Sequence, residues 1–448
     1  MRPCSAASRG KPQSPHPPTD SGTSSMTMQP WFADAKLGIF LHWGIYAVDG
    51  VAESWSFYAD EVSYDAYMAQ LDGFTAAAFD SDAWAGLFAR AGARYTVLTA
   101  KHHDGVALWD TAQSDLSVVK RTPAGRDLLA EYVGAMRRHG LRTGLYFSHL
   151  DWSHPDYATL RHTDPTRPWI TDNPYTMPPE GQEDPERWER YLVFHRAQLR
   201  ELVTGYEPDL LWFDGHWERS ESQWRMSELR QELLAMKADV VLNARMLGHG
   251  DYATPEQGVP ISPSEGPWEL CLTINDSWGH RAGDTNHKSV GQIIRTFAET
   301  IGAGGNLLLA VGPTEDGTIT PEQTARLEGL GSWIERNREA VHGTERGVPF
   351  GHHYGPTTLS KDRRTLYLHC LDAPREFVAL RGLVTPVKRV SVLGTGAGLA
   401  HRTVGGFAGH GVPGVLYIDP PAELDPHITV IAVELDGELE LYRGAGHG

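Results

Sequence analysis

The chain has 448 residues, of which 40% are hydrophobic, and a formal net charge of −17. This length is enough for two or three globular domains. The acidic balance, with no basic cluster, argues against a nucleic acid or an anionic membrane as a partner. The cysteines are Cys4, Cys271 and Cys370, and their wide separation provides neither zinc-ligand spacing nor a disulfide framework.

Residues 1–27 are rich in Ser, Pro, Gly and Thr. Such a composition cannot bury a core, so we expect a disordered tail. The tail contains no apolar segment of the kind found in a secretory signal peptide. No later run is apolar for long enough to span a membrane. These features predict a cytoplasmic location.

From Trp31 onward, apolar strand-like runs alternate with helical patterns. This alternation predicts a parallel β/α domain. About six to eight such units favour a (β/α) barrel over a doubly wound sheet, and no Gly-rich dinucleotide loop follows the early strands. The predicted strands are 37–43, 95–99, 142–148, 209–213, 239–243 and 306–311, and the predicted helices are 81–91, 126–139, 186–204, 222–237, 288–301 and 321–341.

After about Gly343 the helical periodicity ends, and short alternating runs bounded by turns take its place. This pattern predicts an all-β module, most simply a sandwich. We therefore expect a tail at 1–27, a barrel domain at 28–345 and a C-terminal β-sandwich domain at 346–448. The predicted strands of the second domain are 357–359, 365–371, 376–380, 387–393, 415–418 and 428–435.

Polar residues follow several of the predicted strands where each strand ends. The first predicted strand ends on His42 and Trp43, and the third ends on Tyr146 and Ser148. His102 and His103 follow the second strand, Asp214 follows the fourth, and Arg245 comes soon after the fifth. A barrel brings the C-terminal ends of its strands together on one face, where such enzymes place their sites. The succession of polar strand ends therefore predicts an active site.

Each of these residues also has a simpler interpretation. Asp214, followed by Gly215, has the sequence of a turn cap. His102 and His103 have the residue type of metal ligands or of buried core histidines, but no HxH or HExxH pattern accompanies them. As adjacent residues of an extended segment they point in opposite directions, which disfavours a shared metal. The remaining interpretation is a set of hydrogen-bonding groups for a polyhydroxylated ligand.

If Asp214 is a nucleophile, a second carboxyl must act as acid and base. In a retaining glycosidase the two carboxyls lie about 5–5.5 Å apart. The downstream candidates are Asp251, Glu256, Glu265 and Glu269. Glu256 is predicted on a loop and Glu269 in a strand-like run, and spacing alone does not choose between them.

Several segments together resemble one known family. Taken in order over about residues 30–345, they are similar to the α-L-fucosidases of glycoside hydrolase family 29. The resemblance implies retaining hydrolysis of terminal α-L-fucosides, with no metal or other cofactor and with a fucosylated oligosaccharide or glycoconjugate as partner. The segments are Phe40-Leu41-His42-Trp43-Gly44, Lys101-His102-His103-Asp104-Gly105, Leu211-Trp212-Phe213-Asp214-Gly215, Trp278-Gly279 and Gly304-Gly305-Asn306-Leu307-Leu308-Leu309.

The resemblance also implies a role for each matching residue. Asp214 matches the family nucleophile and Glu256 the acid/base, with Glu269 as second choice. In the family Glu and Trp are often adjacent, whereas here Ser54 intervenes. The residues matched to sugar binding are His42, Glu53, His102 and His103 for the hydroxyls, Trp55 beside that Glu, Arg245 near the nucleophile, and Phe40, Trp212 and Trp278 around the sugar's methyl group.

The resulting interpretation is an exo-acting, retaining α-L-fucosidase. Two alternatives remain at this stage. One is a related glycosidase that acts on another L-galacto-configured sugar, and the other is a carbohydrate-binding homologue that has lost catalysis.

Overall fold

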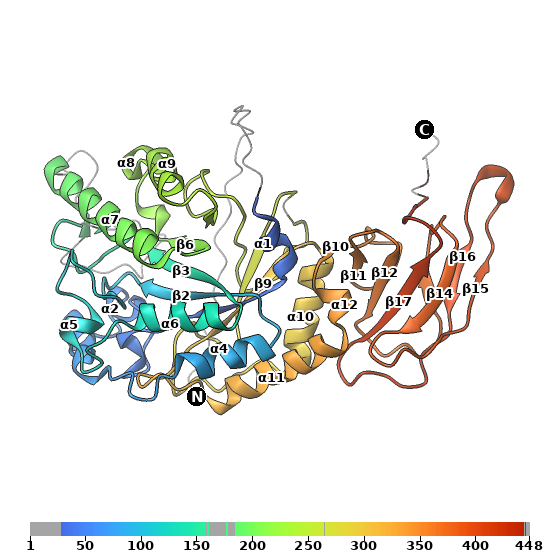
Figure 1. The fold of residues 1–448 in the computed structure, drawn as a ribbon, viewed down its shortest axis with the longest axis horizontal. Coiled ribbons are helices and arrows are strands. Elements are labelled where there is room, and N and C mark those ends of the chain that lie inside the picture. Colours follow the sequence, from blue (N-terminus) through green and yellow to red (C-terminus); the bar gives the residue numbers. More distant parts are fainter. Residues whose placement is uncertain are drawn as a thin grey trace, which may run out of the picture.

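The computed structural model describes residues 28–157, 159–160, 176–177, 184–263, 265–442 and 444. The predicted tail at 1–27, including Cys4, lies outside the described residues. Two bodies lie side by side: one is built on a parallel sheet, and the other, coloured orange to red, is made of antiparallel strands (Figure 1).

The first body contains a seven-stranded sheet in which every neighbouring pair is parallel. The strand order is β7-β6-β3-β2-β1-β9-β8, which confirms the predicted parallel β/α architecture. The strands are β1 (Leu37–Leu41), β2 (Tyr95–Lys101), β3 (Arg142–Ser148), β6 (Leu210–Asp214), β7 (Val241–Leu242), β8 (Glu269–Thr273) and β9 (Asn306–Val311). Outside this sheet, β4 (Thr159–Leu160) and β5 (Thr176–Met177) pair only with each other.

An extended segment at residues 251–257 lies between the two edge strands of this sheet. Asn243, which directly follows β7, forms a parallel bridge with Tyr252, and Glu256 forms one with Cys271 of β8. The backbone N–H of Cys271 donates to the Pro255 carbonyl at 3.1 Å. The segment thus occupies the place of an irregular eighth strand and links β7 to β8, as barrel closure requires.

Helices pack around the parallel sheet, and their ends follow ordinary capping chemistry. Asp80, Asp127, Ser289 and Thr320 each accept a hydrogen bond from a backbone N–H of the first turn of the helix that follows. The longer helices are α4 (Ser81–Arg90), α6 (Leu128–Arg138), α7 (Pro185–Tyr206), α9 (Met226–Met236), α10 (Val290–Gly302) and α11 (Pro321–Arg336). The shorter ones are α1 (Pro30–Ala35), α2 (Trp55–Tyr58), α3 (Tyr64–Ala69), α5 (Val118–Arg121), α8 (Glu221–Trp224) and α12 (Arg338–Val341).

Two predicted helices are interrupted. The one predicted at 222–237 is divided by Arg225, whose left-handed backbone (φ 53°) ends α8 before α9 begins. The one predicted at 321–341 breaks at Asn337, whose side-chain amide donates to the Trp333 carbonyl at 2.9 Å. Within the described residues, no helix combines the length and the apolarity needed to cross a membrane.

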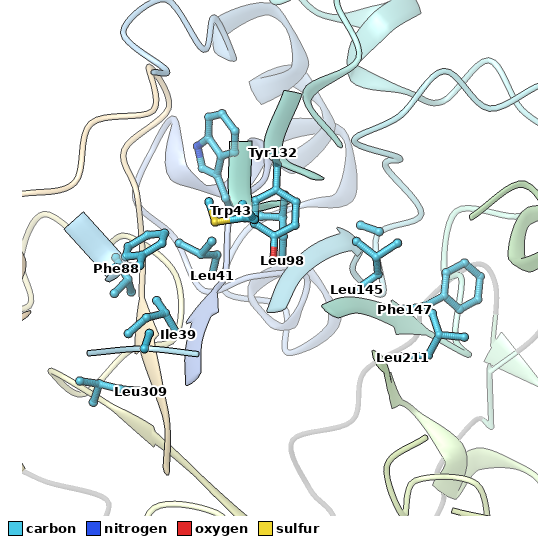
Figure 2. Packing of buried hydrophobic residues seen from close by; sticks show 14 of the residues in the cluster. Ile39, Leu41, Trp43, Phe88, Leu98, Tyr132, Leu145, Phe147, Leu211 and Leu309 are labelled. Carbon is cyan, nitrogen blue, oxygen red and sulfur yellow. The ribbon is translucent and has the colours of Figure 1, made fainter. Parts of the chain in front are cut away.

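The strands of the parallel sheet carry two different apolar layers, because successive side chains point to opposite faces. One layer packs against the helices and contains Ile39, Leu41, Leu98, Leu145, Leu211 and Leu309 together with Phe88 and Tyr132 (Figure 2). The other layer fills the barrel interior and contains Phe40, Tyr95, Val97, Tyr146, Trp212, Cys271 and Leu308.

This alternation decides which strand-end residues face the site. Phe40 and Trp212 are inward-facing, so His42 and Asp214, two residues further along their strands, lie on the same side at the C-terminal rim. The side chains packed inside the barrel therefore support the residues of the site.

The second body is a sandwich of two antiparallel sheets, as predicted. The five-stranded sheet has the order β10-β11-β12-β17-β14 and the three-stranded sheet the order β13-β16-β15. Leu366, Leu368, Leu380, Leu416 and Ile431 belong to the apolar core between them. The strands are β10 (Thr344–Arg346), β11 (Thr357–Ser360), β12 (Thr365–Cys370), β13 (Val378–Leu380), β14 (Val387–Val392), β15 (His401–Val404), β16 (Val415–Ile418) and β17 (Thr429–Leu435).

Two of these strands were not predicted from the sequence. All four residues of β15 are exposed, so the strand lacks the apolar alternation by which strands are recognised. The strand β10 has three residues and pairs with β11 directly after α12. Sheet pairing of the second body therefore begins at Thr344.

Helices α10 and α12 lie between the barrel and the sandwich, and α11 runs along the barrel beside α4 with one end toward the sandwich (Figure 1). The indole N–H of Trp333 in α11 donates to the Ile428 carbonyl at 2.9 Å, and the Thr358 hydroxyl donates to the Ala340 carbonyl at 2.7 Å. Both contacts are buried, and buried hydrogen bonds between elements fix their relative position. The sandwich is therefore fixed to the barrel domain through α11 and α12.

Candidate active site

A cavity of about 630 Å³ opens at the C-terminal ends of the barrel strands, as the sequence analysis predicted. It lies in the size range of cavities that bind small organic ligands. Its lining brings together the following residues singled out from the sequence: Phe40, His42, Glu53, Trp55, His102, Trp212, Asp214, Arg245, Glu256 and Trp278. His103 lies behind this lining, with its Nε2 3.8 Å from Asp214 Oδ2.

Asp214 is the last residue of β6, and its carboxylate is fixed on both oxygens. The Tyr146 hydroxyl donates to Oδ2 at 3.0 Å and Arg245 Nη1 donates to Oδ1 at 2.5 Å. Burial alone would raise the pKa of Asp214, but the charge of Arg245, with the nearby His103, lowers it to about 2. Asp214 is therefore a rigid, ionised carboxylate at neutral pH.

Gly215 makes the turn that leaves Asp214 facing the cavity. Its backbone is left-handed (φ 80°), and a Cβ here would lie 2.3 Å from Leu150 Cγ. Only glycine fits this position without strain or displacement of a neighbour. The Asp-Gly pair is thus a tight turn, and the carboxylate ahead of it binds Arg245 and Tyr146 instead of capping the turn.

Arg245 joins the two carboxylates singled out from the sequence. Its Nη2 donates to Glu256 Oε1 while its Nη1 binds Asp214, and its guanidinium lies 4.6 Å from the centre of the Trp212 ring. The Glu256 side chain is 45% exposed, whereas that of Asp214 is 13% exposed. One guanidinium therefore holds a buried carboxylate and a solvent-accessible carboxylate in the same cavity.

The three histidines are buried and uncharged. Burial lowers the pKa of His42 to about 3 and that of His103 to about 4, and it takes that of His102 well below its usual range. The Ser148 hydroxyl donates to the Leu150 carbonyl at 2.8 Å, so His103 Nδ1, 2.6 Å away, must donate to Ser148. This assigns a lone pair to His103 Nε2, which has no partner among the described residues.

Ser54, the residue inserted between Glu53 and Trp55, has a positioning function. Its hydroxyl lies 2.7 Å from His102 Nδ1 and accepts the backbone N–H of Asp104 at 2.9 Å. Its own backbone is left-handed (φ 49°), and Glu53 and Trp55 on either side both line the cavity. The insertion therefore leaves both neighbours at the site.

Aromatic rings form one wall of the cavity. Phe40 lies 4.9 Å from Trp212 and 6.0 Å from Trp278, measured between ring centroids. The Trp212 indole N–H donates to Glu269 Oε1 at 2.9 Å, which fixes the ring plane. These rings form an apolar pocket beside the polar groups.

Glu269, the second choice for the acid/base, does not line this cavity. It is the first residue of β8, and its carboxylate lies inside the barrel, where it accepts hydrogen bonds from Tyr95 and Trp212. Its side chain is fully buried, and burial raises the pKa of its carboxyl to about 7. Its position fits support of the Trp212 ring and not proton transfer at the cavity.

The cavity is also lined by Tyr146, one of the polar residues at the predicted strand ends, and by His216 and Trp217, which the sequence analysis does not single out. Tyr146 pairs in register with Trp212 across β3 and β6, and both residues belong to the inward-facing layer of the barrel. His216 and Trp217 lie in the 3₁₀ turn directly after Gly215, and neither periodicity nor a motif places that turn at the rim.

Within the part of the chain that the structure describes, no three His, Cys, Asp or Glu side chains are grouped to hold a metal ion.

Comparisons with known proteins agree with this geometry. The family model described as alpha-L-fucosidase matches residues 4–339. The tissue alpha-L-fucosidase of Rattus norvegicus is 34% identical over 346 residues, 70% of each chain. The alpha-L-fucosidase of Branchiostoma floridae is 30% identical over 425 residues, 85% of this chain and 90% of that one.

Solved structures show the same similarity across nearly the whole chain. Alpha-L-fucosidase isoenzyme 1 from Paenibacillus thiaminolyticus has a TM-score of 0.79 and 32% identity, covering 91% of this chain and 98% of that one. A family 29 alpha-L-fucosidase from Bacteroides thetaiotaomicron has a TM-score of 0.81 and 26% identity, covering 96% of this chain and all of that one.

Two carboxylates beside an aromatic wall at the C-terminal rim of a (β/α) barrel are typical of a glycoside hydrolase, the class to which the similar proteins belong. Within that class, the chain belongs to the α-L-fucosidase family, glycoside hydrolase family 29.

The buried carboxyl of Glu269 predicts a pH dependence of stability. Its folded-state pKa of about 7 exceeds the ordinary value of 4.5, so between these values the folded protein holds a proton that the unfolded chain has lost. We therefore compare the free energy of unfolding of the native protein with that of Glu269→Gln. The difference between them, native minus variant, should fall by up to about 3 kcal/mol as pH rises from 4.5 to 7. Urea unfolding at several pH values measures this difference.

The exposed Glu265 provides the matched control. Glu265→Gln should keep the pH profile of the native protein. Parallel profiles for the native protein and Glu269→Gln would show that Glu269 is ionised in the folded state throughout this range.

Proposed function

We propose that this protein is an exo-acting, retaining α-L-fucosidase in which Asp214 is the nucleophile and Glu256 the acid/base. The observation that carries this assignment is the bridge from Arg245 to both carboxylates. Asp214 is ionised and held in a fixed orientation, as a nucleophile must be. Glu256 is accessible to solvent, as a group that exchanges protons with water must be.

In the first step Asp214 attacks the anomeric carbon, and the bond from that carbon to the leaving oxygen breaks. Protonated Glu256 donates its proton to the leaving oxygen, so the departing group leaves as an alcohol. The product is a fucosyl ester of Asp214 with inverted configuration. A related enzyme supports such an ester: the Bacteroides thetaiotaomicron structure described as a trapped covalent intermediate with 2-fluoro-fucosyl fluoride has a TM-score of 0.80 and 25% identity to this chain.

In the second step Glu256 acts as a base and removes a proton from the attacking water. Ester formation removes the negative charge of Asp214, so Arg245 keeps Glu256 as its only charged partner in this bridge. Water attack restores Asp214 and yields fucose with net retention.

The buried end of the cavity accounts for recognition of a terminal sugar. His42 lines the cavity and its Nδ1 has no hydrogen-bond partner among the described residues, although buried polar atoms of this kind require hydrogen bonds. Sugar hydroxyls supply them. Burial also raises the pKa of Glu53 to about 7, so this carboxyl can donate or accept near neutral pH. The aromatic wall of Phe40, Trp212 and Trp278 takes the C6 methyl group.

The alternatives from the sequence make different predictions at this site. A glycosidase for another L-galacto sugar needs space for a hydroxyl at C6, whereas here three aromatic rings occupy that wall. A binding protein without catalysis has no need of an ionised carboxylate and a solvent-accessible carboxylate on one guanidinium. The geometry therefore favours hydrolysis of fucosides.

The aromatic wall predicts the preferred sugar. The α-L-galactoside differs from the α-L-fucoside by a C6 hydroxyl that these rings leave without a partner. Its kcat/KM should be lower by about tenfold to two hundredfold with the same aryl leaving group. Equal values for the two substrates would show that Phe40, Trp212 and Trp278 do not contact C6.

The carboxyl assignment is tested with Glu256→Ala and an aryl α-L-fucoside. A good leaving group needs little acid assistance, so the covalent intermediate should accumulate as a burst, followed by turnover slowed about 10²- to 10⁴-fold. Removal of the glutamate frees Arg245 Nη2 for an anion. Added azide should therefore restore turnover and yield α-L-fucosyl azide, identified by NMR.

Asp214→Ala and Glu265→Ala complete this test. Asp214→Ala should show no burst, and any azide product should have the β configuration, because azide then attacks the substrate directly. Glu265→Ala, an exposed glutamate outside the cavity, should keep native turnover. Near-native turnover of Glu256→Ala on substrates with poor leaving groups would remove Glu256 from the acid/base position.

A further inference from the structure

His149 links the backbones of Asp214 and Arg245. It directly follows β3, and its backbone N–H donates to the Asp214 carbonyl at 2.8 Å. Its ring nitrogen Nε2 lies 3.2 Å from the Arg245 carbonyl oxygen. The side chain is fully buried and does not line the cavity. His149 therefore contacts the nucleophile and the bridging arginine from outside the cavity.

A second buried histidine and an arginine continue this contact into α7. His149 Nδ1 lies 3.1 Å from His195 Nε2, and His195 Nδ1 lies 3.0 Å from Arg196 Nη1. The other terminal nitrogen of Arg196 donates to the Trp224 carbonyl at 2.7 Å, which fixes the guanidinium. One continuous chain of hydrogen-bonding groups thus runs from α7 to the carbonyl of Arg245.

The two end groups set the direction of every hydrogen bond in this chain. A guanidinium only donates, so His195 Nδ1 must accept from Arg196. A neutral imidazole has one N–H, so that of His195 is on Nε2 and donates to His149 Nδ1. The N–H of His149 is then on Nε2 and donates to the Arg245 carbonyl. Both rings must be neutral for this pattern, and burial lowers the pKa of each well below its usual range.

The backbone of Arg245 has little other support. Arg245 lies between β7 and the segment at residues 251–257, outside every helix and strand. Among the described residues, neither its N–H nor its carbonyl takes part in a backbone–backbone hydrogen bond. The His149 ring is itself held in place, because it stacks on Phe213 with centroids 4.7 Å apart and an interplanar angle of 8°. The His149 N–H is therefore a fixed donor for an otherwise irregular stretch of main chain.

We infer that His149 is a positioning residue, whose ring fixes the Arg245 carbonyl and thereby the guanidinium that bridges the two carboxylates. The inference rests on the proposed function, because those carboxylates are the proposed nucleophile and acid/base. A group at the reacting centre must be held to within a fraction of an ångström to act at full rate. Every His149 variant except proline keeps the backbone N–H that binds Asp214, so a change of side chain tests the contact with Arg245 by itself.

The experiment compares three substitutions of His149 on an aryl α-L-fucoside. His149→Phe keeps a ring that can stack on Phe213 but has no N–H, so its kcat/KM should fall about 10- to 100-fold. His149→Asn has an amide that can accept from His195 but is too short to reach the Arg245 carbonyl, and it should show a similar loss. His149→Gln places an amide N–H at the position of Nε2, so it should restore most of the native kcat/KM.

A double-mutant cycle and a control separate positioning from general damage. If His149 acts through Arg245, adding His149→Asn to Arg245→Ala should change kcat/KM by less than about twofold. General damage would lower kcat/KM by the same factor with and without Arg245. His369, a fully buried histidine of the sandwich that is hydrogen-bonded to Thr358, provides the matched control, and His369→Asn should keep the native kcat/KM.

Native kcat/KM in His149→Asn, an equal loss in His149→Asn and His149→Gln, or an undiminished loss in the Arg245→Ala background would overturn the positioning role. In each of these cases the activity of the native protein still supports the proposed function. If the native protein releases no aryl group from the fucoside, the proposed function fails and the positioning role fails with it.

Discussion

The site depends on one guanidinium. Arg245 follows β7 and reaches across the cavity to Asp214 at the end of β6 and to Glu256 on the closing segment. Its charge offsets the burial of Asp214 and brings the pKa of that carboxyl to about 2. Without this cation, burial would favour a protonated Asp214, which is a poor nucleophile. The proposed division of work between the two carboxylates therefore rests on a single ion-pair network.

The position of Arg245 in turn depends on how the barrel closes. Residues 251–257 bridge β7 and β8 by backbone pairing, so Glu256 is attached to the sheet and does not lie on the free loop expected from the sequence. Asp251 fixes the start of this segment, because its carboxylate accepts the Leu242 N–H at 2.8 Å and binds Arg230 at 2.6 Å. The proposed acid/base is therefore held by the backbone pairing of this segment, and only its side chain needs to move.

Much of this could be predicted from the sequence, because the physical signals are local. Apolar runs that alternate with helical patterns identify the barrel strands. Polar residues at the ends of these runs identify His42 and Asp214. The alternation of side chains between the two faces of a strand would also have placed Glu269 in the barrel interior. Glu269 is the first residue of β8 and lies deep in the barrel, whereas Asp214 is the last residue of β6 and lies at the rim. Applied fully, this rule would have favoured Glu256 over Glu269 without a structure.

Other features depend on contacts between distant residues and have no local signal. The closing segment contains Pro255 and lacks strand periodicity, and its pairing is with residues distant in the sequence, such as Cys271 of β8. Trp217 reaches the rim through the left-handed turn at Gly215 and the packing of its ring on His103. The exposed strand β15 forms by pairing with β16, although its own sequence lacks apolar alternation.

The claim that Asp214 is the nucleophile has a direct chemical test. The protein would be treated with 2-deoxy-2-fluoro-α-L-fucosyl fluoride, in which the 2-fluorine slows hydrolysis of the ester, and then digested at low pH and sequenced by mass spectrometry. The account predicts one 2-fluorofucosyl group per chain, on the peptide that contains Asp214. A label on Glu53, Glu256 or any other residue, or turnover of the reagent with no labelled carboxylate, would contradict it.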